Sequence, residues 1–160
     1  MAIKTQLQQL IANYRSGGEA LAEAVRGLNE GELLHHRLPE KWSIKQIAIH
    51  LADAELAVSF RVRNILSENS PPLQVFEQDN WTNTLDYEAL DLEAALQRFQ
   101  LLRAANSELL ERLNEEAWTR TGEHPENGLI TLEGLIAGQI AHLQGHIEQI
   151  DVSLQDYRSR

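Results

Sequence analysis

Apolar residues recur at steps of three and four in four long segments of the chain, which is the spacing of one face of an α-helix. In the first segment, which we expect to be helical to about residue 27, these residues are Ile3, Leu7, Leu10, Ile11, Tyr14, Leu21, Val25 and Leu28. Gly17 and Gly18 interrupt the segment. Because glycine in a helix interior costs roughly 1 kcal/mol relative to alanine, the pair predicts a bend or a close contact with another helix.

The second segment begins with the stretch KWSIKQI at residues 41–47, which carries a strong helix-start signal. Ser43 is a good N-cap, Gln46 completes a capping box, and Trp42 can pack on Ile47 as a hydrophobic staple. The apolar face that follows consists of Ile44, Ile47, Leu51, Ala54, Val58, Val62 and Ile65. His50 falls among these positions, so we expect its side chain to point into the interior.

Residues 68–88 contain Pro71 and Pro72 and have no helical period until the chain reaches Asp91, a suitable N-cap. This connection is too long for a tight turn between neighbouring helices, which predicts a crossover between the second and third helices. The third helix then carries Leu92, Leu96, Phe99, Leu102, Leu109 and Leu113. A turn-rich stretch, TRTGEHPENG, precedes a fourth helix that is capped by Thr131 and carries Leu132, Leu135, Ile136, Ile140, Leu143, Ile147, Ile150 and Leu154.

No segment shows the alternation of a β-strand, and no internal repeat is apparent. The pattern therefore predicts an all-α four-helix bundle. A chain of 160 residues is close to the most common size of one domain, so we expect residues 1–160 to form a single domain.

Charge and composition exclude several classes of partner. The chain has 24 acidic against 14 basic residues and a formal charge of −10, which would repel nucleic acids and anionic membranes. No run approaches the roughly 18 apolar residues that span a bilayer, and the amino terminus lacks the apolar core of a signal peptide. We therefore expect a cytoplasmic protein. The chain has no cysteine, so any metal must be held by His, Asp or Glu.

Three histidines are candidate metal ligands. In IAHLQGHIEQID, residues 140–151, His142 and His146 are four positions apart, which brings their side chains within ~6 Å on one side of a helix. The inward-facing His50 would supply a third ligand if the second and fourth helices are neighbours. Three histidines with one open position form a known catalytic zinc arrangement, and imidazole also suits nickel, copper and iron.

Ordinary partly buried, hydrogen-bonded histidines are the alternative interpretation of the same spacing. The remaining histidines, His35, His36 and His124, have the sequence context of surface residues. Leu143 stands where a zincin peptidase needs its glutamate, which argues against HExxH chemistry. A carboxylate-bridged di-iron centre needs Glu three residues before each ligating histidine, and the chain has Ile47, Gln139 and Leu143 at those positions.

Several side chains near the candidate ligands are candidates for supporting the metal site. Carboxylates and amides often orient a ligating imidazole, and the candidates here are Asp53, Glu55, Glu148 and Gln149. We favour the alternative that these are solvated groups on helix surfaces. In the crossover, Phe76 and Trp81 can cover the mouth of a pocket and bring Glu77 or Asp79 near the metal, although we favour a simple anchoring of the loop.

These residues resemble the DinB/YfiT-like superfamily of metal-dependent proteins. The resemblance rests on WSIKQIAIHLADAE at residues 42–55, on FEQDNW at residues 76–81 and on HPENGLITLEGLIAGQIAHLQGHIEQI at residues 124–150. It implies an up-down-down-up bundle in which residues 68–88 form the crossover, and a zinc or nickel site made by His50, His142 and His146. Members often form dimers, so a homodimer is expected here.

The family's known activities include thiol-dependent S-transferases and a thiol-dependent isomerase. The resemblance therefore favours thiol-dependent S-transferase chemistry on a small-molecule substrate, in which the metal holds a low-molecular-weight thiol in its deprotonated form. A metal-dependent hydrolase is the competing enzymatic interpretation. A non-catalytic metal-binding module is the third, and coordination closed by four protein ligands would favour it.

Overall fold

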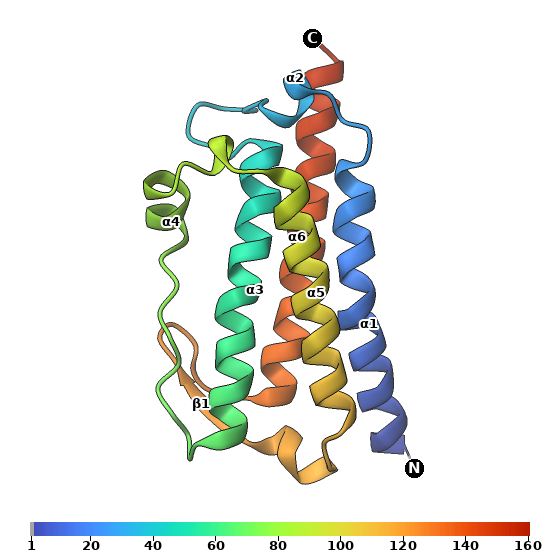
Figure 1. Ribbon diagram of the computed structural model, residues 1–160, viewed down its shortest axis with the longest axis vertical. Helices are drawn as coiled ribbons and strands as arrows, with labels where there is room; N and C mark the ends of the chain where they lie inside the picture. Colours follow the sequence, from blue (N-terminus) through green and yellow to red (C-terminus); the bar gives the residue numbers. More distant parts are fainter. Residues whose placement is uncertain (1) are drawn as a thin grey trace.

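The computed structural model describes residues 2–160, and four long helices make up most of it (Figure 1). These are α1 (Ala2–Val25), α3 (Ile44–Ser67), α5 (Leu92–Glu111) and α6 (Leu132–Arg158). The shorter elements are α2 (Glu30–Leu33), α4 (Gln78–Thr84), the 3-10 helices η1 (Tyr87–Ala89) and η2 (Glu115–Thr119), and the strands β1 (Thr121–His124) and β2 (Gly128–Thr131). The predicted four-helix bundle is confirmed.

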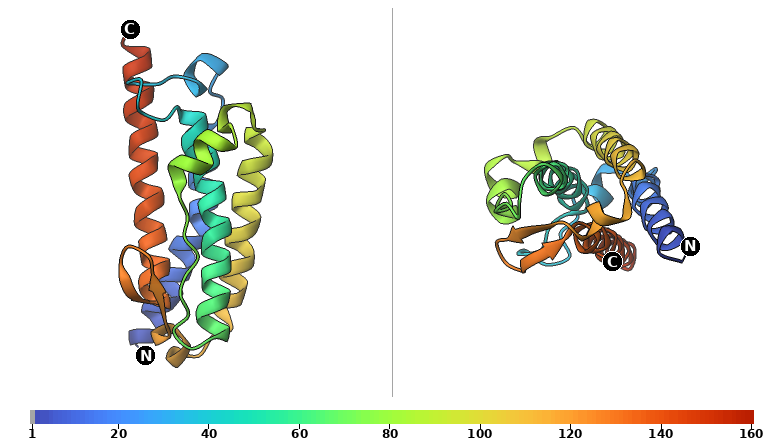
Figure 2. Two further views of the ribbon diagram at one scale, coloured as in Figure 1. Left: turned by 90° about the vertical axis from the view of Figure 1, so that its left-hand side faces the viewer. Right: turned by 90° about the horizontal axis from the view of Figure 1, so that it is seen from below.

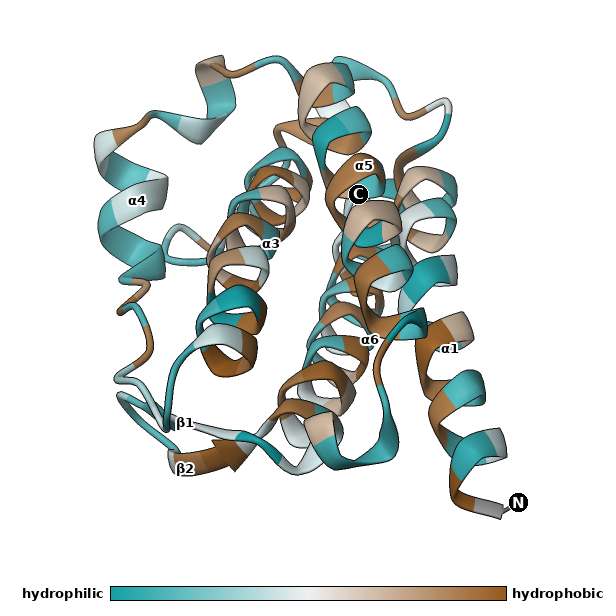
Figure 3. Ribbon diagram, turned by 60° about the horizontal axis from the view of Figure 1, so that its bottom comes forward, coloured by the Kyte–Doolittle hydropathy of each residue, from teal (hydrophilic) through white to brown (hydrophobic). Residues whose placement is uncertain are grey.

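The long helices run in two directions in Figure 1. Helices α1 and α6 point toward the end of the bundle that holds the C-terminus, and α3 and α5 point the other way. Viewed along the bundle, α1 and α3 each pack against both α5 and α6 (Figure 2). Polar and apolar residues share the circumference of each long helix (Figure 3), as the periodicity predicts. No helix within residues 2–160 combines the length and apolar character needed to cross a membrane.

The predicted helix starts are present. The Ser43 side chain accepts a hydrogen bond from the Gln46 backbone N–H, and the Gln46 side chain accepts one from the Ser43 N–H. The Asp91 and Thr131 side chains cap α5 and α6 by accepting from the Ala94 and Gly134 backbone N–H groups, without the reciprocal bond. Helix α1 ends at Val25, slightly before the predicted residue 27, and the chain turns at Gly27, whose φ of 71° favours glycine.

The prediction that the chain contains no strand is wrong. Strands β1 and β2 pair antiparallel, with Thr121 opposite Thr131 and His124 opposite Gly128. The crossover adds a second partner to β1, because the Leu73 N–H donates to the Glu123 carbonyl at 2.9 Å. These strands are too short for alternation to reveal them, and their pairing depends on a segment distant in sequence.

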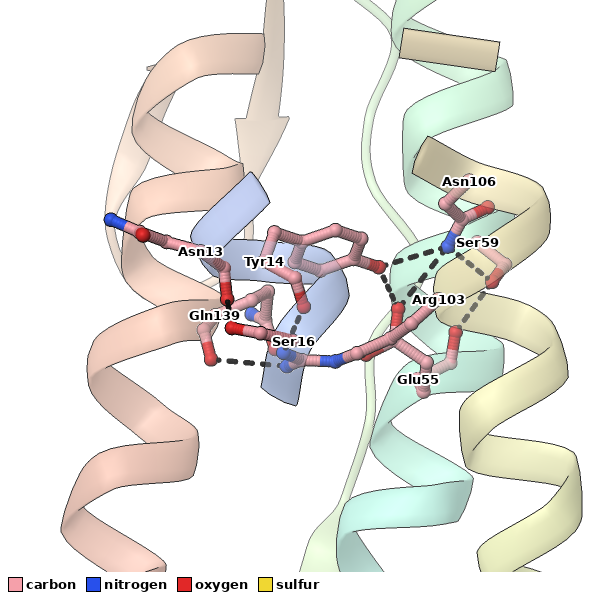
Figure 4. Close-up of polar contacts among 8 residues, drawn as sticks. All are labelled: Asn13, Tyr14, Ser16, Glu55, Ser59, Arg103, Asn106 and Gln139. Atoms are coloured by element: carbon pink, nitrogen blue, oxygen red, sulfur yellow. Dashed lines mark hydrogen bonds and ion pairs between the residues drawn. The ribbon is translucent and has the colours of Figure 1, made fainter. Parts of the chain in front are cut away.

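A buried guanidinium joins all four long helices (Figure 4). Arg103 of α5 is 2% exposed, and its Nε donates to a carboxylate oxygen of Glu55, on α3, at 3.0 Å. Its Nη1 donates to the Tyr14 carbonyl of α1 at 2.8 Å, and its Nη2 donates to the Gln139 carbonyl of α6 at 3.3 Å. The carboxylate, two backbone carbonyls and one cation therefore hold the bundle together at a single level.

The rest of this network satisfies Glu55. The Tyr14 hydroxyl donates to the same carboxylate, and Asn106 Nδ2 donates to it at 3.1 Å. Gly17 gives Arg103 its space, since a Cβ at that position would lie 2.1 Å from Arg103 Nη1. The close helix contact expected at the glycine pair is thus present, and Gly17 makes it with the buried guanidinium.

Replacing Arg103 with Met should destabilise the protein by about 3–5 kcal/mol, because the substitution leaves the Glu55 carboxylate buried without its cation. The free energy of unfolding from chemical denaturation measures this loss. Arg112→Met, at the exposed residue that follows the C-terminus of α5, is the control and should change stability by no more than about 0.5 kcal/mol. A loss below 1 kcal/mol for Arg103→Met would contradict a structural role for the ion pair.

Candidate metal centre

The three predicted histidines come together between α3 and α6. The Nε2 atoms of His50 and His142 lie 3.3 Å apart, and those of His142 and His146 lie 3.1 Å apart. All three residues offer ligand atoms within 4.8 Å of one another. His50 is buried and the other two are half-buried, so the cluster lies at the edge of the core and is open on its α6 side.

The donor set fits a metal ion better than it fits a hydrogen-bonded cluster. A neutral imidazole nitrogen carries either one hydrogen or one lone pair. His142 Nε2 lies close to two other Nε2 atoms and can therefore form a hydrogen bond with only one of them. Three nitrogens at the usual zinc distance in a tetrahedral arrangement would lie about 3.3 Å apart, close to the separations seen here.

Burial keeps these imidazoles neutral. Burial, followed by the neighbouring His146 and His142, lowers the pKa of His50 to about 3. The pKa of His142 is lowered to about 4, first by burial and then by His146 and Arg103. Burial also lowers the pKa of His146. All three histidines are consequently neutral at pH 7, and their lone pairs are available for a metal.

Gln149 orients one of the three rings. Its Oε1 lies 3.0 Å from His146 Nδ1, and an amide oxygen can only accept, so Nδ1 carries the hydrogen. This tautomer leaves the lone pair on Nε2, the atom that faces the other histidines. By contrast, His50 Nδ1 is buried and has no hydrogen-bond partner within residues 2–160.

The other candidates for orienting an imidazole do not reach the cluster. Asp53 and Glu55 were expected to be solvated, and both are instead buried, at 5% and 1% exposure. Asp53 accepts from the Tyr87 hydroxyl at 2.8 Å and from Arg98 at 2.6 Å, while Glu55 pairs with Arg103. Glu148 is exposed, as predicted. The two acids can be buried because they pair with Arg98 and Arg103. These cations lie on α5, far along the chain, so the local sequence does not reveal them.

Aromatic rings enclose the histidines. The Trp42 ring lies 4.7 Å from the His50 ring and stacks on His146 at 6.2 Å and 14°. Phe76, from the crossover, stacks on His50 at 5.7 Å, and Trp81 meets the Phe76 ring at 4.8 Å. The crossover thus covers the site, whereas the sequence favours a simple anchoring of the loop. The sequence predicts Trp42 only as a helix staple and does not reveal its contact with the histidines.

The acidic residues of the crossover and the remaining histidines lie outside the cluster. Glu77 and Asp79 are exposed. The His36 ring is 2.8 Å from Glu88, and His124 Nδ1 accepts backbone N–H groups, both in keeping with ordinary histidines. His35 is more buried than predicted, because its side chain is 10% exposed and lies 2.7 Å from Asp156.

One sizeable cavity is remote from the histidines. It measures about 650 Å³, and its apolar wall includes Leu7, Ile11, Leu110 and Trp118 near the opposite end of the bundle. A smaller cavity of about 440 Å³ includes Gln149, the residue that contacts His146, in its wall. The donor chemistry, rather than cavity size, therefore identifies the histidine cluster as the candidate site.

Comparison with known proteins finds relatives that cover most of the chain. A family model described as the DinB superfamily matches residues 13–150. A relative from Geobacillus kaustophilus, provisionally named a metal-dependent hydrolase, is 31% identical over 91% of this chain and 82% of its own length.

Two solved structures share the fold. YfiT from Bacillus subtilis, provisionally described as a metal-dependent hydrolase with an unusual four-helix bundle topology, superposes with a TM-score of 0.89. It is 24% identical, and the match covers 95% of this chain and 87% of YfiT. A mycothiol-dependent maleylpyruvate isomerase superposes with a TM-score of 0.73 at 14% identity, over 90% of this chain and 60% of the isomerase.

Proposed function

The chain belongs to the DinB superfamily, and we propose that it binds one divalent metal ion through His50, His142 and His146. The convergence of three neutral Nε2 atoms carries this proposal. Their separations suit ligation of one ion, and His142 Nε2 has two close nitrogen neighbours but can form a hydrogen bond with only one of them. The relatives named as metal-dependent hydrolases support it. Nitrogen ligands of this kind suit zinc or nickel.

We further propose that the site activates a low-molecular-weight thiol for transfer to an electrophilic small molecule. A bound divalent ion lowers the pKa of a coordinated thiol, so that the thiolate is available near neutral pH. The chain has no cysteine, so the sulfur would arrive with a cosubstrate. The fold shared with a mycothiol-dependent isomerase supports this choice.

Hydrolysis is the alternative, and the relatives' names favour it. A zincin-type hydrolase uses a glutamate as general base beside its metal. Leu143 occupies the zincin glutamate position. The acids nearest to His50 in sequence, Asp53 and Glu55, are held in ion pairs with α5. A thiolate attacks without such a base, which is why we prefer thiol transfer.

The side chains around the site have definable roles in this proposal. Gln149 fixes the tautomer of His146 through Nδ1. Trp42 and Phe76 pack on His50, which restricts the orientation of its ring and limits access of water to that side of the cluster. A non-catalytic metal-binding role would not require the half-buried, open side that the two α6 histidines provide.

Metal affinity should fall in a graded series of variants. His146→Ala removes a ligand and should weaken binding by at least about 100-fold, whereas Gln149→Leu removes only the orienting contact and should weaken it about 10-fold. Titration of zinc against a competing chelator measures both. His124→Ala and Glu148→Leu are the matched controls and should bind as the unmodified protein does. Full metal occupancy in purified His146→Ala would rule out the assignment.

Thiol transfer and hydrolysis can be separated by one panel of assays. The metal-loaded protein should accelerate the reaction of at least one small thiol with a generic electrophile, and His50→Ala should not. The rate of thiol consumption measures this. Equal background rates from both proteins, together with ester hydrolysis that requires the metal and His50, would replace thiol transfer with hydrolysis.

We also propose that residues 1–160 act as one domain in a cytoplasmic homodimer. The apolar residues Leu56 and Phe60, one turn apart on α3, remain 40% and 53% exposed. Bundles commonly bury such residues between subunits. Light scattering at micromolar concentration should therefore give twice the 18.1 kDa mass of one chain. A mass of one chain would refute the dimer without affecting the metal site.

A further inference from the structure

A cavity of about 440 Å³ lies between the segment that precedes α3 and the C-terminal half of α6. Arg37 and Lys41 contribute to it from the first side, and Gly145, Glu148 and Gln149 from the second. Its size falls within the range of small-molecule sites. Gly145 leaves this face of α6 open, since a Cβ there would meet nothing within 4 Å.

Gln149 connects the cavity to the proposed metal position. Gln149 lines the cavity and its Oε1 lies 3.0 Å from Nδ1 of His146, while Nε2 of that histidine faces the other two ligands. The other wall is connected as well, because Lys41 directly precedes Trp42, whose ring stacks on His146. A ligand that contacts both places must extend past Gln149 or Trp42.

Charge distinguishes this cavity from the rest of the surface. Within residues 2–160, ten of the 14 Lys and Arg side chains pair with or donate to a protein oxygen. The four that do not are Lys4, Arg37, Lys41 and Arg112, and two of these line the same cavity. The one acid in its wall, Glu148, is exposed and does not pair with either cation. In a chain of net charge −10, two adjacent cations without acidic partners favour an anionic ligand.

We propose that this cavity binds the carboxylate groups of the thiol cosubstrate, while its sulfur reaches the metal position. The inference rests on the proposed function and narrows it to anionic thiols. Arg37 and Lys41 are both exposed, so their contribution should be modest and should weaken as salt is added.

The test compares glutathione with its diethyl ester, which keeps the same peptide backbone and the same thiol but has no free carboxylate. Dissociation constants come from the thiolate absorption band of the cobalt-substituted protein. Glutathione should bind at least about threefold more tightly than the diester at low salt. Arg37→Gln combined with Lys41→Gln should abolish that preference. Arg112→Gln, an unpaired cation outside the cavity, is the matched control and should retain it.

A second measurement does not depend on the metal. In the metal-free protein, S-methylglutathione should shift the backbone amide NMR signals of Gly145 and Val152, and the double variant should lose these shifts. Equal affinity for glutathione and its diester, or a preference that survives in the double variant, would overturn the anion site and leave thiol activation intact. Absence of a thiolate band with either thiol would instead overturn thiol activation, and the amide shifts would still decide whether the cavity binds the anion.

Discussion

The buried guanidinium of Arg103 is the constraint on which the arrangement of this bundle depends. It contacts Glu55 on α3 and the Gln139 carbonyl on α6, the two helices that carry the histidines. Glu55 follows His50 by little more than one turn, and Gln139 precedes His142 by about one turn. The separation of α3 and α6 at the histidines is therefore fixed by a neighbouring layer in which every partner is already satisfied. Gly17 makes that layer possible, because any side chain there would displace the cation.

Next to this layer, the three histidines bring together imidazole lone pairs that hydrogen bonds do not fully use. Burial keeps His50 and His142 neutral, and Gln149 directs the lone pair of His146 toward them. The rings of Trp42 and Phe76 pack against the His50 imidazole. A hydrogen-bond network with too few hydrogens is unfavourable in a low-dielectric interior, so an ion that accepts three lone pairs would stabilise the fold as well as supply chemistry.

Local signals in the sequence were sufficient for the helices and for the three histidines. Ser43, Asp91 and Thr131 cap their helices as predicted, since capping depends on residues only a few positions apart. Partners distant in sequence were not predictable in this way. Asp53 and Glu55 seemed to be surface acids because their cations, Arg98 and Arg103, lie on another helix. The β1–β2 hairpin was missed for the same reason, since the crossover completes its pairing.

X-ray absorption spectroscopy of the zinc-loaded protein can detect a bound cosubstrate, because the chain has no cysteine and a metal–thiolate distance must come from an added thiol. We expect three imidazole nitrogens at about 2.0–2.1 Å before addition, and a new sulfur at about 2.3 Å after it. A metal that has fewer than three imidazole ligands, or that keeps an unchanged set of ligands when saturated with thiol, would contradict a three-histidine site with a position open to a cosubstrate.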